Sequence, residues 1–555
     1  MRVIVAGAAF LALIPFSATA VVDQQGEHVA EGPHGEALKL ALAAPDAAAE
    51  ATEAHYRESD YRGLWIGADG DDGRAQALLA ALDAAGGHGL PAAAYRAEAL
   101  RAAVEAAAAG DPSAVAAAEL ALTRAFLDYA GDIHGGVLEP SRVDRDLHVV
   151  PPVIDERALL ERLAAAGDAA GFLDGLAPAN PNYARLTAGL AALRALPDDA
   201  WGAPAPGGPS IRPGEAGQRV ALVRARLIAL GDHAAPAAPA QDPAAQNLPA
   251  QNLNIFDPAL VESVRAFQRR HGLNDDGVIG ARTVEAMNAS IDDRIGQALV
   301  NLERLRWNNR PEAPRYIDVN QADYTVQVID NGAILFDERV VIGSRRNRTP
   351  EFSEMMTYMV FNPTWNVPRS IATQEILPAL QEDPEYLAKK NMRLISRDGT
   401  PPPDPYMTDW SLYSAGDFPF AVKQNPGGGN SLGRVKFMFP NAYSIYLHDT
   451  PSKRLFAKDA RAFSHGCIRV RDPMRLAVVL LSPQEADPQA LIDRLLARGR
   501  EVTVNLETPI PVHLGYRTAW IDELGRSQFR EDIYGRDARV LSALQAAGVV
   551  TGPDS

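Results

Sequence analysis

The chain of 555 residues is too long for one ordinary hydrophobic core, and its length predicts about three domains. Apolar residues make up 47% and charged residues 22%, proportions that are ordinary for a globular protein. The net charge of −16 argues against nucleic acid as the main partner, because a phosphate-binding surface has to be basic.

The first twenty residues have the pattern of an export signal. Arg2 supplies a positive charge, Val3 to Phe16 form an apolar run, and Ala18-Thr19-Ala20 is typical of a cleavage site. The alternative is a short membrane anchor, but the apolar run is too short to cross a bilayer comfortably. We therefore expect residues 1–20 to be a signal peptide, and we expect no stable membrane insertion after its cleavage.

Alanine-rich segments with apolar residues at three- and four-residue spacing predict helices over residues 37–205. Residues 75–82 and 119–127 show the spacing most clearly. We expect an all-α domain here, and no chemical motif stands out in it. The Pro/Gly-rich stretch 203–213 is typical of a linker.

A second, smaller helical module is predicted over residues 217–290. An Ala/Pro/Gln/Asn insert at residues 234–253 separates its two halves and is expected to be a loop. This module resembles the peptidoglycan-binding type 1 domain, and a generic three-helix bundle is the alternative. The residues that carry this resemblance are Phe267-Gln268, His271-Gly272-Leu273, Asp276-Gly277, Gly280 and Thr283.

From residue 315 the pattern changes to the two-residue alternation of β-strands. Asp330-Asn331-Gly332 stands between two alternating segments and predicts a hairpin. Helix-like and Pro-rich sequence at about 370–425 interrupts the strands, and we expect this insertion to be a lid or a binding loop. The β domain is expected over 315–505 and a C-terminal extension over 506–555. Its strands are expected at 316–320, 324–329, 333–336, 356–361, 435–439 and 444–447.

The chemistry is expected at the one cysteine of the sequence. A Ser-His-Gly-Cys motif ends at Cys467, and His448 precedes it along the chain. A Cys–His pair is the minimal machinery for covalent acyl transfer, and the glycine permits a tight turn beside the thiol. The neighbouring cations, Arg469 and Arg471 among them, are expected to lower the pKa of the thiol. The alternative is a buried cysteine beside chance histidines.

His448 followed by the segment from Ser464 to Arg469 resembles the L,D-transpeptidase family, whose catalytic domain is called YkuD. The order of signal, helical region, peptidoglycan-binding module and interrupted β domain is similar to the long periplasmic form of that family. The resemblance implies a multidomain chain located in the periplasm. It would have an all-α scaffold domain, a small α-helical peptidoglycan-binding domain and a mostly-β catalytic domain with an inserted capping subdomain.

The resemblance also implies roles in catalysis. Cys467 is the expected nucleophile and His448 the expected general base. Ser464 and His465 belong to the same candidate catalytic turn, with His465 as the rival base. The backbone N–H groups of Gly466 and Cys467 are expected to form an oxyanion hole.

Three further residues are candidates for binding substrate. Arg469 is expected to hold a carboxylate of a peptide stem, with a structural ion pair as the alternative. Asp449 is expected to help orient the ring of His448. Tyr446 is expected to line the pocket, although aromatic residues on strands more often belong to the core.

The implied reaction uses peptidoglycan stem peptides and glycan as substrate, with other cell-wall synthesis enzymes as further partners. A tetrapeptide stem would acylate Cys467, a second stem would accept the acyl group in a 3→3 cross-link, and carbapenems would acylate the same thiol. No metal or cofactor is expected, since the sequence lacks the zinc motifs His-Glu-x-x-His and His-x-x-Glu-His. The alternatives are a hydrolase on the same fold, a transferase that attaches proteins to the wall, and a non-catalytic wall-binding protein.

Overall fold

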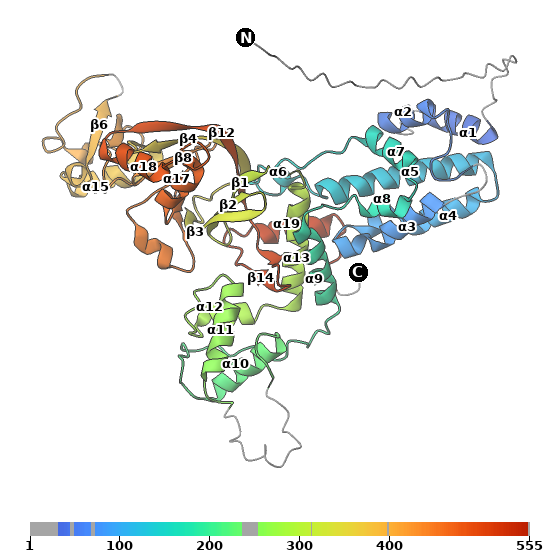
Figure 1. The fold of residues 1–555 in the computed structure, drawn as a ribbon, viewed down its shortest axis with the longest axis horizontal. Coiled ribbons are helices and arrows are strands. Elements are labelled where there is room, and N and C mark those ends of the chain that lie inside the picture. The colour runs from blue at the N-terminus through green and yellow to red at the C-terminus, as the bar shows by residue number, and fades with distance from the viewer. Residues whose placement is uncertain are drawn as a thin grey trace, which may run out of the picture.

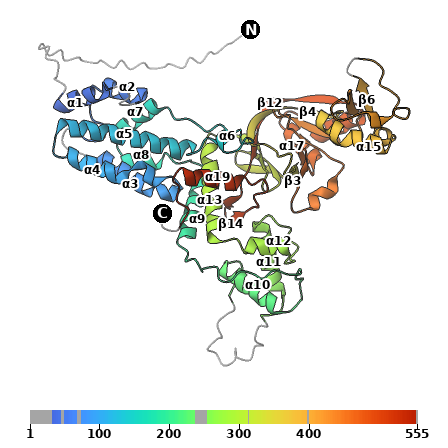
Figure 2. The ribbon, with the colours of Figure 1, turned by 180° about the vertical axis from the view of Figure 1, so that it is seen from behind.

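The computed structural model describes residues 32–44, 49–67, 73–235, 253–311, 313–396 and 399–552. The expected signal peptide, residues 1–20, lies outside these segments, as does most of the expected insert at 234–253. The described part forms a helical scaffold lobe, a small helical lobe and a mostly-β lobe (Figure 1). They meet around helices α13 (Ile291–Trp307) and α19 (Arg536–Ala546), and the view from behind shows the same junction (Figure 2). The expected multidomain fold class is confirmed.

Helices build the scaffold lobe. The long helix α5 (Pro112–Gly135) begins at a proline after Asp111, whose carboxylate accepts the Ala114 N–H and caps the helix. Apolar side chains on α5 pack against those of the other helices to form the core of the lobe. These helices are α1 (Pro33–Leu42), α2 (Glu50–Glu58), α3 (Gly73–Ala84), η1 (Ala85–His88), η2 (Ala92–Tyr95), α4 (Ala97–Ala107), α6 (Pro140–Val143), α7 (Glu156–Ala165), α8 (Ala169–Asp174) and α9 (Pro181–Arg194).

The small lobe contains α10 (Gln218–Ala229), α11 (Pro258–Arg270) and α12 (Ala281–Met287) around their own core. The buried Gln268 amide donates to Asp276 Oδ1 and accepts the Gly277 N–H. The side chain of Gln268 therefore fixes the turn that follows its own helix. The two sequence signatures of this module, on the helix and in the turn, form one hydrogen-bonded unit.

Helix α13 connects the three lobes, although the sequence analysis left residues 291–314 outside every predicted domain. Ser290 and Asp293 form a capping box at its start. Glu303 and Arg306 on this helix form a fully buried ion pair at 2.8 Å. The Glu303 carboxylate also accepts the Leu138 N–H of the scaffold lobe. Because a buried charge is costly without partners, this pair ties α13 firmly to the scaffold lobe.

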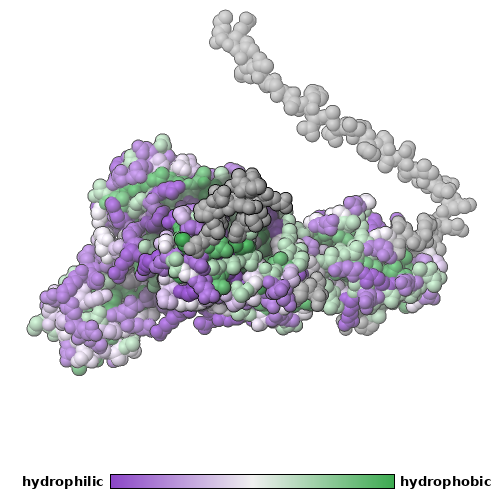
Figure 3. Space-filling model, turned by 90° about the horizontal axis from the view of Figure 1, so that it is seen from below, coloured by the Kyte–Doolittle hydropathy of each residue, from purple (hydrophilic) through white to green (hydrophobic). Residues whose placement is uncertain are grey.

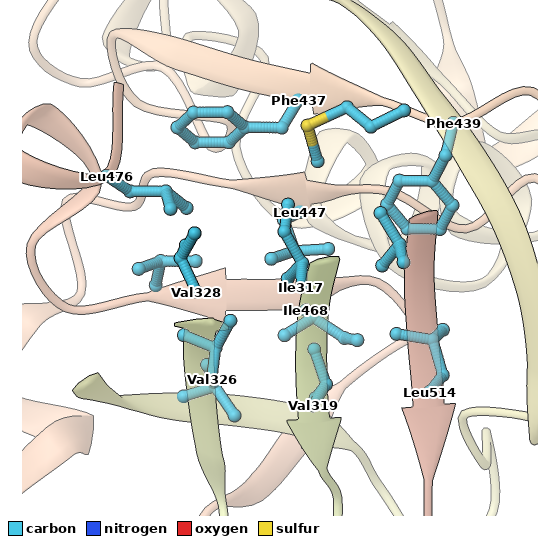
Figure 4. Packing of buried hydrophobic residues seen from close by; sticks show 14 of the residues in the cluster. Ile317, Val319, Val326, Val328, Phe437, Phe439, Leu447, Ile468, Leu476 and Leu514 are labelled. Atoms are coloured by element: carbon cyan, nitrogen blue, oxygen red, sulfur yellow. The ribbon is translucent and has the colours of Figure 1, made fainter. Parts of the chain in front are cut away.

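A nine-stranded sheet forms most of the described β lobe, in the order β10-β3-β11-β9-β8-β4-β12-β1-β2. A further pairing of β2 with β3 closes the sheet on itself. Buried apolar side chains from several strands and from helix α17 point toward one another inside it (Figure 4). The elements are β1 (Arg315–Asn320), β2 (Thr325–Asp330), β3 (Ala333–Gly343), β4 (Phe352–Phe361), β8 (Val435–Met438), β9 (Leu447–His448), η6 (Lys453–Ala457), β10 (Ala462–Ser464), β11 (Ile468–Val470), α17 (Pro473–Leu481), α18 (Pro488–Ala497) and β12 (Val502–Gly515).

The predicted hairpin is confirmed. Strands β2 and β3 pair in antiparallel fashion, with Asp330 opposite Ala333. Asn331 and Gly332 between them have φ values of 49° and 81°. Two successive residues with positive φ are typical of the tight turn that Asn-Gly favours between strands.

One expectation for the β lobe was wrong. The strand expected at 444–447 is reduced to Leu447–His448, because the Asn441 side chain holds the Ile445 N–H and carbonyl in a turn. Ser444 in that turn has a φ of 58°. The last strand, β12, runs past the expected domain end at residue 505 to Gly515 and pairs with both β1 and β4.

The insertion forms a small subdomain, called the cap below, which comprises residues 365–424. A three-stranded sheet in the order β5-β7-β6 packs with short helices around a separate apolar core. The cap begins before the expected residue 370, because β5 pairs with β7 and not with the main sheet. Its elements are β5 (Trp365–Val367), α14 (Arg369–Ile371), the π-helical turn η4 (Ala372–Ile376), α15 (Leu377–Glu382), α16 (Tyr386–Lys389), β6 (Met392–Ser396), η5 (Trp410–Leu412) and β7 (Phe420–Gln424).

The C-terminal region returns to the junction of the lobes as the hairpin β13 (Ala519–Ile521) and β14 (Ser527–Phe529), followed by α19. Seen from below, hydrophilic residues make up much of the surface of the β lobe, with hydrophobic residues among them (Figure 3). In the described segments, no helix combines the length and the apolar character needed to cross a membrane.

Candidate active site

A tight turn between β10 and β11 carries the cysteine. Ser464 Oγ donates to the Cys467 carbonyl at 2.5 Å and accepts the Gly466 N–H at 3.1 Å. Gly466 has a φ of 117°, a conformation that L-residues with a side chain rarely adopt. Thr349 Oγ1 donates to the Gly466 carbonyl at 2.7 Å from outside the turn. The turn is therefore fixed from both sides, which accounts for Ser and Gly at these places in the motif.

The N–H of Gly466 was expected to bind an oxyanion, but it has another partner. It is directed to Ser464 Oγ within the turn, so it is not free to bind an oxyanion. For the Cys467 N–H, no hydrogen bond is found within the described part of the chain. The candidate oxyanion donor in this arrangement is therefore the Cys467 N–H.

The side chains of Cys467, Arg469, Tyr446 and His448 share one face of the sheet. Strands β9 and β11 run parallel, with His448 beside Arg469. Their neighbours Leu447 and Ile468 point into the core. Because successive side chains on a strand point to opposite faces, the four candidates lie together on the outer face.

The Cys467 thiol is partly buried, and its Sγ lies 3.6 Å from the Ser444 carbonyl. Burial raises the pKa of the thiol to about 11. Hydrogen bonds from Tyr446, and the charges of Arg469 and Lys436, lower this pKa by less. The expectation that nearby cations lower the thiol pKa overall was therefore wrong in sign, because burial outweighs them. A thiol that is neutral near pH 7 needs a base in order to attack a carbonyl.

His448 has the properties of that base. It is buried, and its Nδ1 lies 2.5 Å from the Asp449 carbonyl, which requires the proton on Nδ1 and leaves Nε2 unprotonated. Burial lowers the pKa of His448 to about 3, the charge of Arg469 lowers it too, and the contact with Asp449 raises it by less. The imidazole is therefore neutral near pH 7 and can accept a proton.

Asp449 orients the ring of His448 through its backbone, whereas its side chain serves another purpose. Its carboxylate accepts the N–H groups of Arg434 and Thr450 and pairs with Lys453 at 2.8 Å. With these partners the carboxylate stabilises the loop that follows β9. Contact of Asp449 with substrate stays a prediction.

Two cations flank the thiol. Arg469 is partly buried, and its buried Nε has no hydrogen-bond partner among the described residues. Lys436 on β8 lies opposite His448 in the sheet, and its Nζ is 5.9 Å from the centre of the Tyr446 ring. Lys436 was not among the residues predicted for the site, although β8 alternates between buried and partly exposed residues and places this lysine on the outer face. Two cations on this face suit a carboxylate-bearing substrate.

Tyr446 contacts the thiol directly. Its hydroxyl is hydrogen-bonded to the Cys467 side chain, and burial raises the pKa of Tyr446 well above its ordinary value. The hydroxyl therefore stays protonated and can donate to sulfur. Tyr446 also packs against the edge of the main core, so it combines both of the roles considered for it.

His465 points toward the cap. Its Nε2 lies 2.6 Å from Glu375 Oε1 on the π-helical turn η4, and both side chains are about half exposed. The sequence analysis had no signal for Glu375, because it lies far from the motif along the chain. Within the described segments, no three His, Cys, Asp or Glu side chains lie close enough together to hold a metal ion.

Comparisons with known proteins identify three domains in the chain. The L,D-transpeptidase catalytic domain matches residues 314–506, the "Putative peptidoglycan binding domain" matches residues 216–287, and a scaffold domain matches residues 50–190. A protein of Haemophilus influenzae described as "Putative L,D-transpeptidase" is 33% identical over 252 residues. This match covers 45% of the chain and only half of the relative.

A crystal structure of the L,D-transpeptidase from Xylanimonas cellulosilytica (residues 123–326) is 14% identical. It is covered completely by a match to 56% of the chain, but its TM-score of 0.17 is too low to support an argument. The domain matches are decisive, because the cysteine turn and its histidine lie inside residues 314–506. The chain thus carries an L,D-transpeptidase catalytic domain, joined to a peptidoglycan-binding domain and a scaffold domain.

Proposed function

We propose that this chain is an exported peptidoglycan L,D-transpeptidase that forms 3→3 cross-links through a thioester on Cys467. The observation that carries the proposal is that a neutral, partly buried thiol and a buried histidine with an unprotonated Nε2 lie on the same face of neighbouring strands. Such a pair becomes nucleophilic only as His448 removes the thiol proton. Its place in an L,D-transpeptidase catalytic domain supports the substrate class.

The first half-reaction forms the acyl-enzyme. Sulfur attacks the carbonyl of the third residue of a tetrapeptide stem, and His448 Nε2 accepts the thiol proton. The oxyanion faces the Cys467 N–H. The C–N bond to the terminal D-Ala breaks, its nitrogen takes the proton from His448, and a thioester remains.

The second half-reaction resolves the thioester. The side-chain amine of another stem attacks the thioester carbonyl, and the C–S electron pair returns to sulfur. One N–H proton of the amine passes to that sulfur and restores the thiol. Arg469 and Lys436 are placed to hold stem carboxylates near the thiol. The peptidoglycan-binding domain would keep the chain on its polymeric substrate. This reaction takes place in the periplasm if residues 1–20 act as the signal peptide.

Product analysis tests the proposal. The mature chain and its Cys467→Ala variant are incubated with purified disaccharide-tetrapeptide muropeptides, and the products are separated and weighed. The proposal expects cross-linked dimers that have lost one D-Ala, formed by the wild type alone. Shortened monomers without dimers would instead show a hydrolase, and products that persist in Cys467→Ala would remove the cysteine from the reaction.

A further inference from the structure

The cap sends one carboxylate to the catalytic turn. Glu375 lies on the π-helical turn η4 and contacts His465, two residues before the nucleophile. Its charge also acts on Arg469, which in turn acts on Cys467. Glu375 therefore lies within electrostatic range of the reacting groups, although it belongs to a separate subdomain.

The π-helical turn aims this side chain. A π-helix holds one more residue per hydrogen-bonded turn than an α-helix, and such turns often occur at functional sites. An added or removed residue rotates the following side chains by about 100° around the helix axis. The apolar neighbours of Glu375, Ile371 and Ile376, stay in the core of the cap. Glu375 is thereby directed outward, to the side of the catalytic turn.

Glu375 also differs in charge from the other groups at the thiol. Arg469 and Lys436 are cations, and the Asp449 carboxylate is occupied by Arg434, Thr450 and Lys453. A carboxylate can accept about four hydrogen bonds. For Glu375 only the ion-pair contact of Oε1 with His465 Nε2 is found in the described part of the chain, and the side chain is 52% exposed. Oε2 is thus open to a ligand with hydrogen-bond donors.

We propose that Glu375 binds the ammonium group of the acceptor and so selects a primary amine, not water, to resolve the thioester. This inference rests on the proposed function. In this arrangement, stem carboxylates bind to the cations of the sheet, and the acceptor ammonium binds to the carboxylate of the cap. An amine with an ordinary pKa of about 10.4 arrives protonated, so a carboxylate is the natural group to hold it.

The transfer step forms one C–N bond and breaks one C–S bond. The ammonium loses one proton to water through His448 Nε2. The nitrogen lone pair then forms the C–N bond, the C–S electron pair returns to sulfur, and the second N–H proton ends on the thiol. Glu375 takes no part in bond making. It holds the nitrogen beside the thioester, as an acceptor-binding residue.

Glu375→Gln tests the role of the negative charge, because glutamine has nearly the shape of glutamate but is neutral. The amide oxygen can still accept from His465, but the negative charge is lost. Two nucleophiles are compared on the thioester formed from the tetrapeptide donor. Nα-acetyl-lysine offers a charged primary amine, and hydroxylamine is an uncharged nucleophile in neutral to mildly alkaline buffer. The matched control is Glu382→Gln, since Glu382 is an exposed carboxylate on α15 of the same cap.

We expect Glu375→Gln to raise the KM for Nα-acetyl-lysine by about tenfold or more, the loss typical of one hydrogen bond to a charged group. The rate with hydroxylamine and the rate of carbapenem adduct formation should stay within about twofold of the wild-type rates. Glu375→Asp should bring the KM for Nα-acetyl-lysine part of the way back to the wild-type value, since aspartate restores the charge. An unchanged KM, or an equal loss with both nucleophiles, would overturn the inference. A wild type that forms the thioester but transfers it to no amine would refute the proposed function instead.

Discussion

Replacement of His448 by glutamine is expected to slow the acylation of Cys467 by about 10²- to 10⁴-fold, the usual contribution of a general base. The reason is that the thiol, with a pKa of about 11, is almost fully protonated near pH 7, so the proposed attack needs His448 as its base. The rate is measured by intact mass spectrometry as a carbapenem adduct accumulates. His513→Gln is the control, because His513 lies on β12 of the same sheet beside Ser353. Equal slowing in both variants would show a general loss of structure.

The pH profile of the same reaction tests the protonation states. The reactive form pairs a protonated thiol with a neutral imidazole, and it dominates between the His448 pKa of about 3 and the Cys467 pKa of about 11. The acylation rate of the wild type should therefore be flat from about pH 5 to about pH 8. A preformed thiolate–imidazolium pair would give a rate that changes with a pKa inside this range. That outcome would contradict the assignment.

The second large effect is expected far from the thiol, at Arg536 of the C-terminal region. Its fully buried guanidinium donates to Glu351 at 2.9 Å and to the Thr349 carbonyl at 2.7 Å. Thr349 in turn holds the Gly466 carbonyl of the catalytic turn. Arg536→Met leaves the Glu351 charge buried and loosens Thr349. We expect a loss of about 3–5 kcal/mol in the free energy of unfolding, and slower acylation of the molecules that remain folded.

The loss in the free energy of unfolding of Arg536→Met should depend on pH. Burial raises the pKa of Glu351, and Arg536 lowers it, so Arg536→Met raises this pKa further. The folded variant then binds a proton more tightly than the unfolded chain, and its stability falls as pH rises through that range. The destabilisation should be smaller at about pH 5 than at about pH 8. Adding Glu351→Gln to Arg536→Met should restore part of the lost stability.

Denaturant unfolding monitored at both pH values measures the effect. The control is Arg539→Met, one turn further along α19, where the half-exposed guanidinium pairs with Asp144. Stability that is unchanged in Arg536→Met would contradict the role given to this network. A variant that unfolds more easily but is acylated at the wild-type rate would limit the role of Arg536 to folding.

The parts of this molecule that the sequence predicts well are governed by neighbouring residues. The Asn331-Gly332 turn follows from the φ values that these residues tolerate, and the hairpin formed as expected. The turn at Cys467 likewise has local hydrogen bonds that join Ser464 Oγ to Gly466 and Cys467, although the distant Thr349 also holds it. The motif could therefore locate the candidate site, although it could not show that the Gly466 N–H is used inside the turn.

What the sequence could not predict depends on burial and on distant segments. Helix α13 was missed because Glu303, Arg304 and Arg306 give it a polar pattern, yet all three are buried. The sign of the thiol pKa shift was missed because cations can be counted in a sequence, whereas desolvation cannot. Glu375 was missed because only the folded cap brings it to His465.

The central claim is that Cys467 is the nucleophile of an acyl-transfer site. Intact mass spectrometry of the mature chain after incubation with a carbapenem tests it most directly, with the Cys467→Ala variant treated in parallel. One adduct per molecule is expected on the wild type and none on the variant. An unmodified wild type, or an adduct on both proteins, would contradict it.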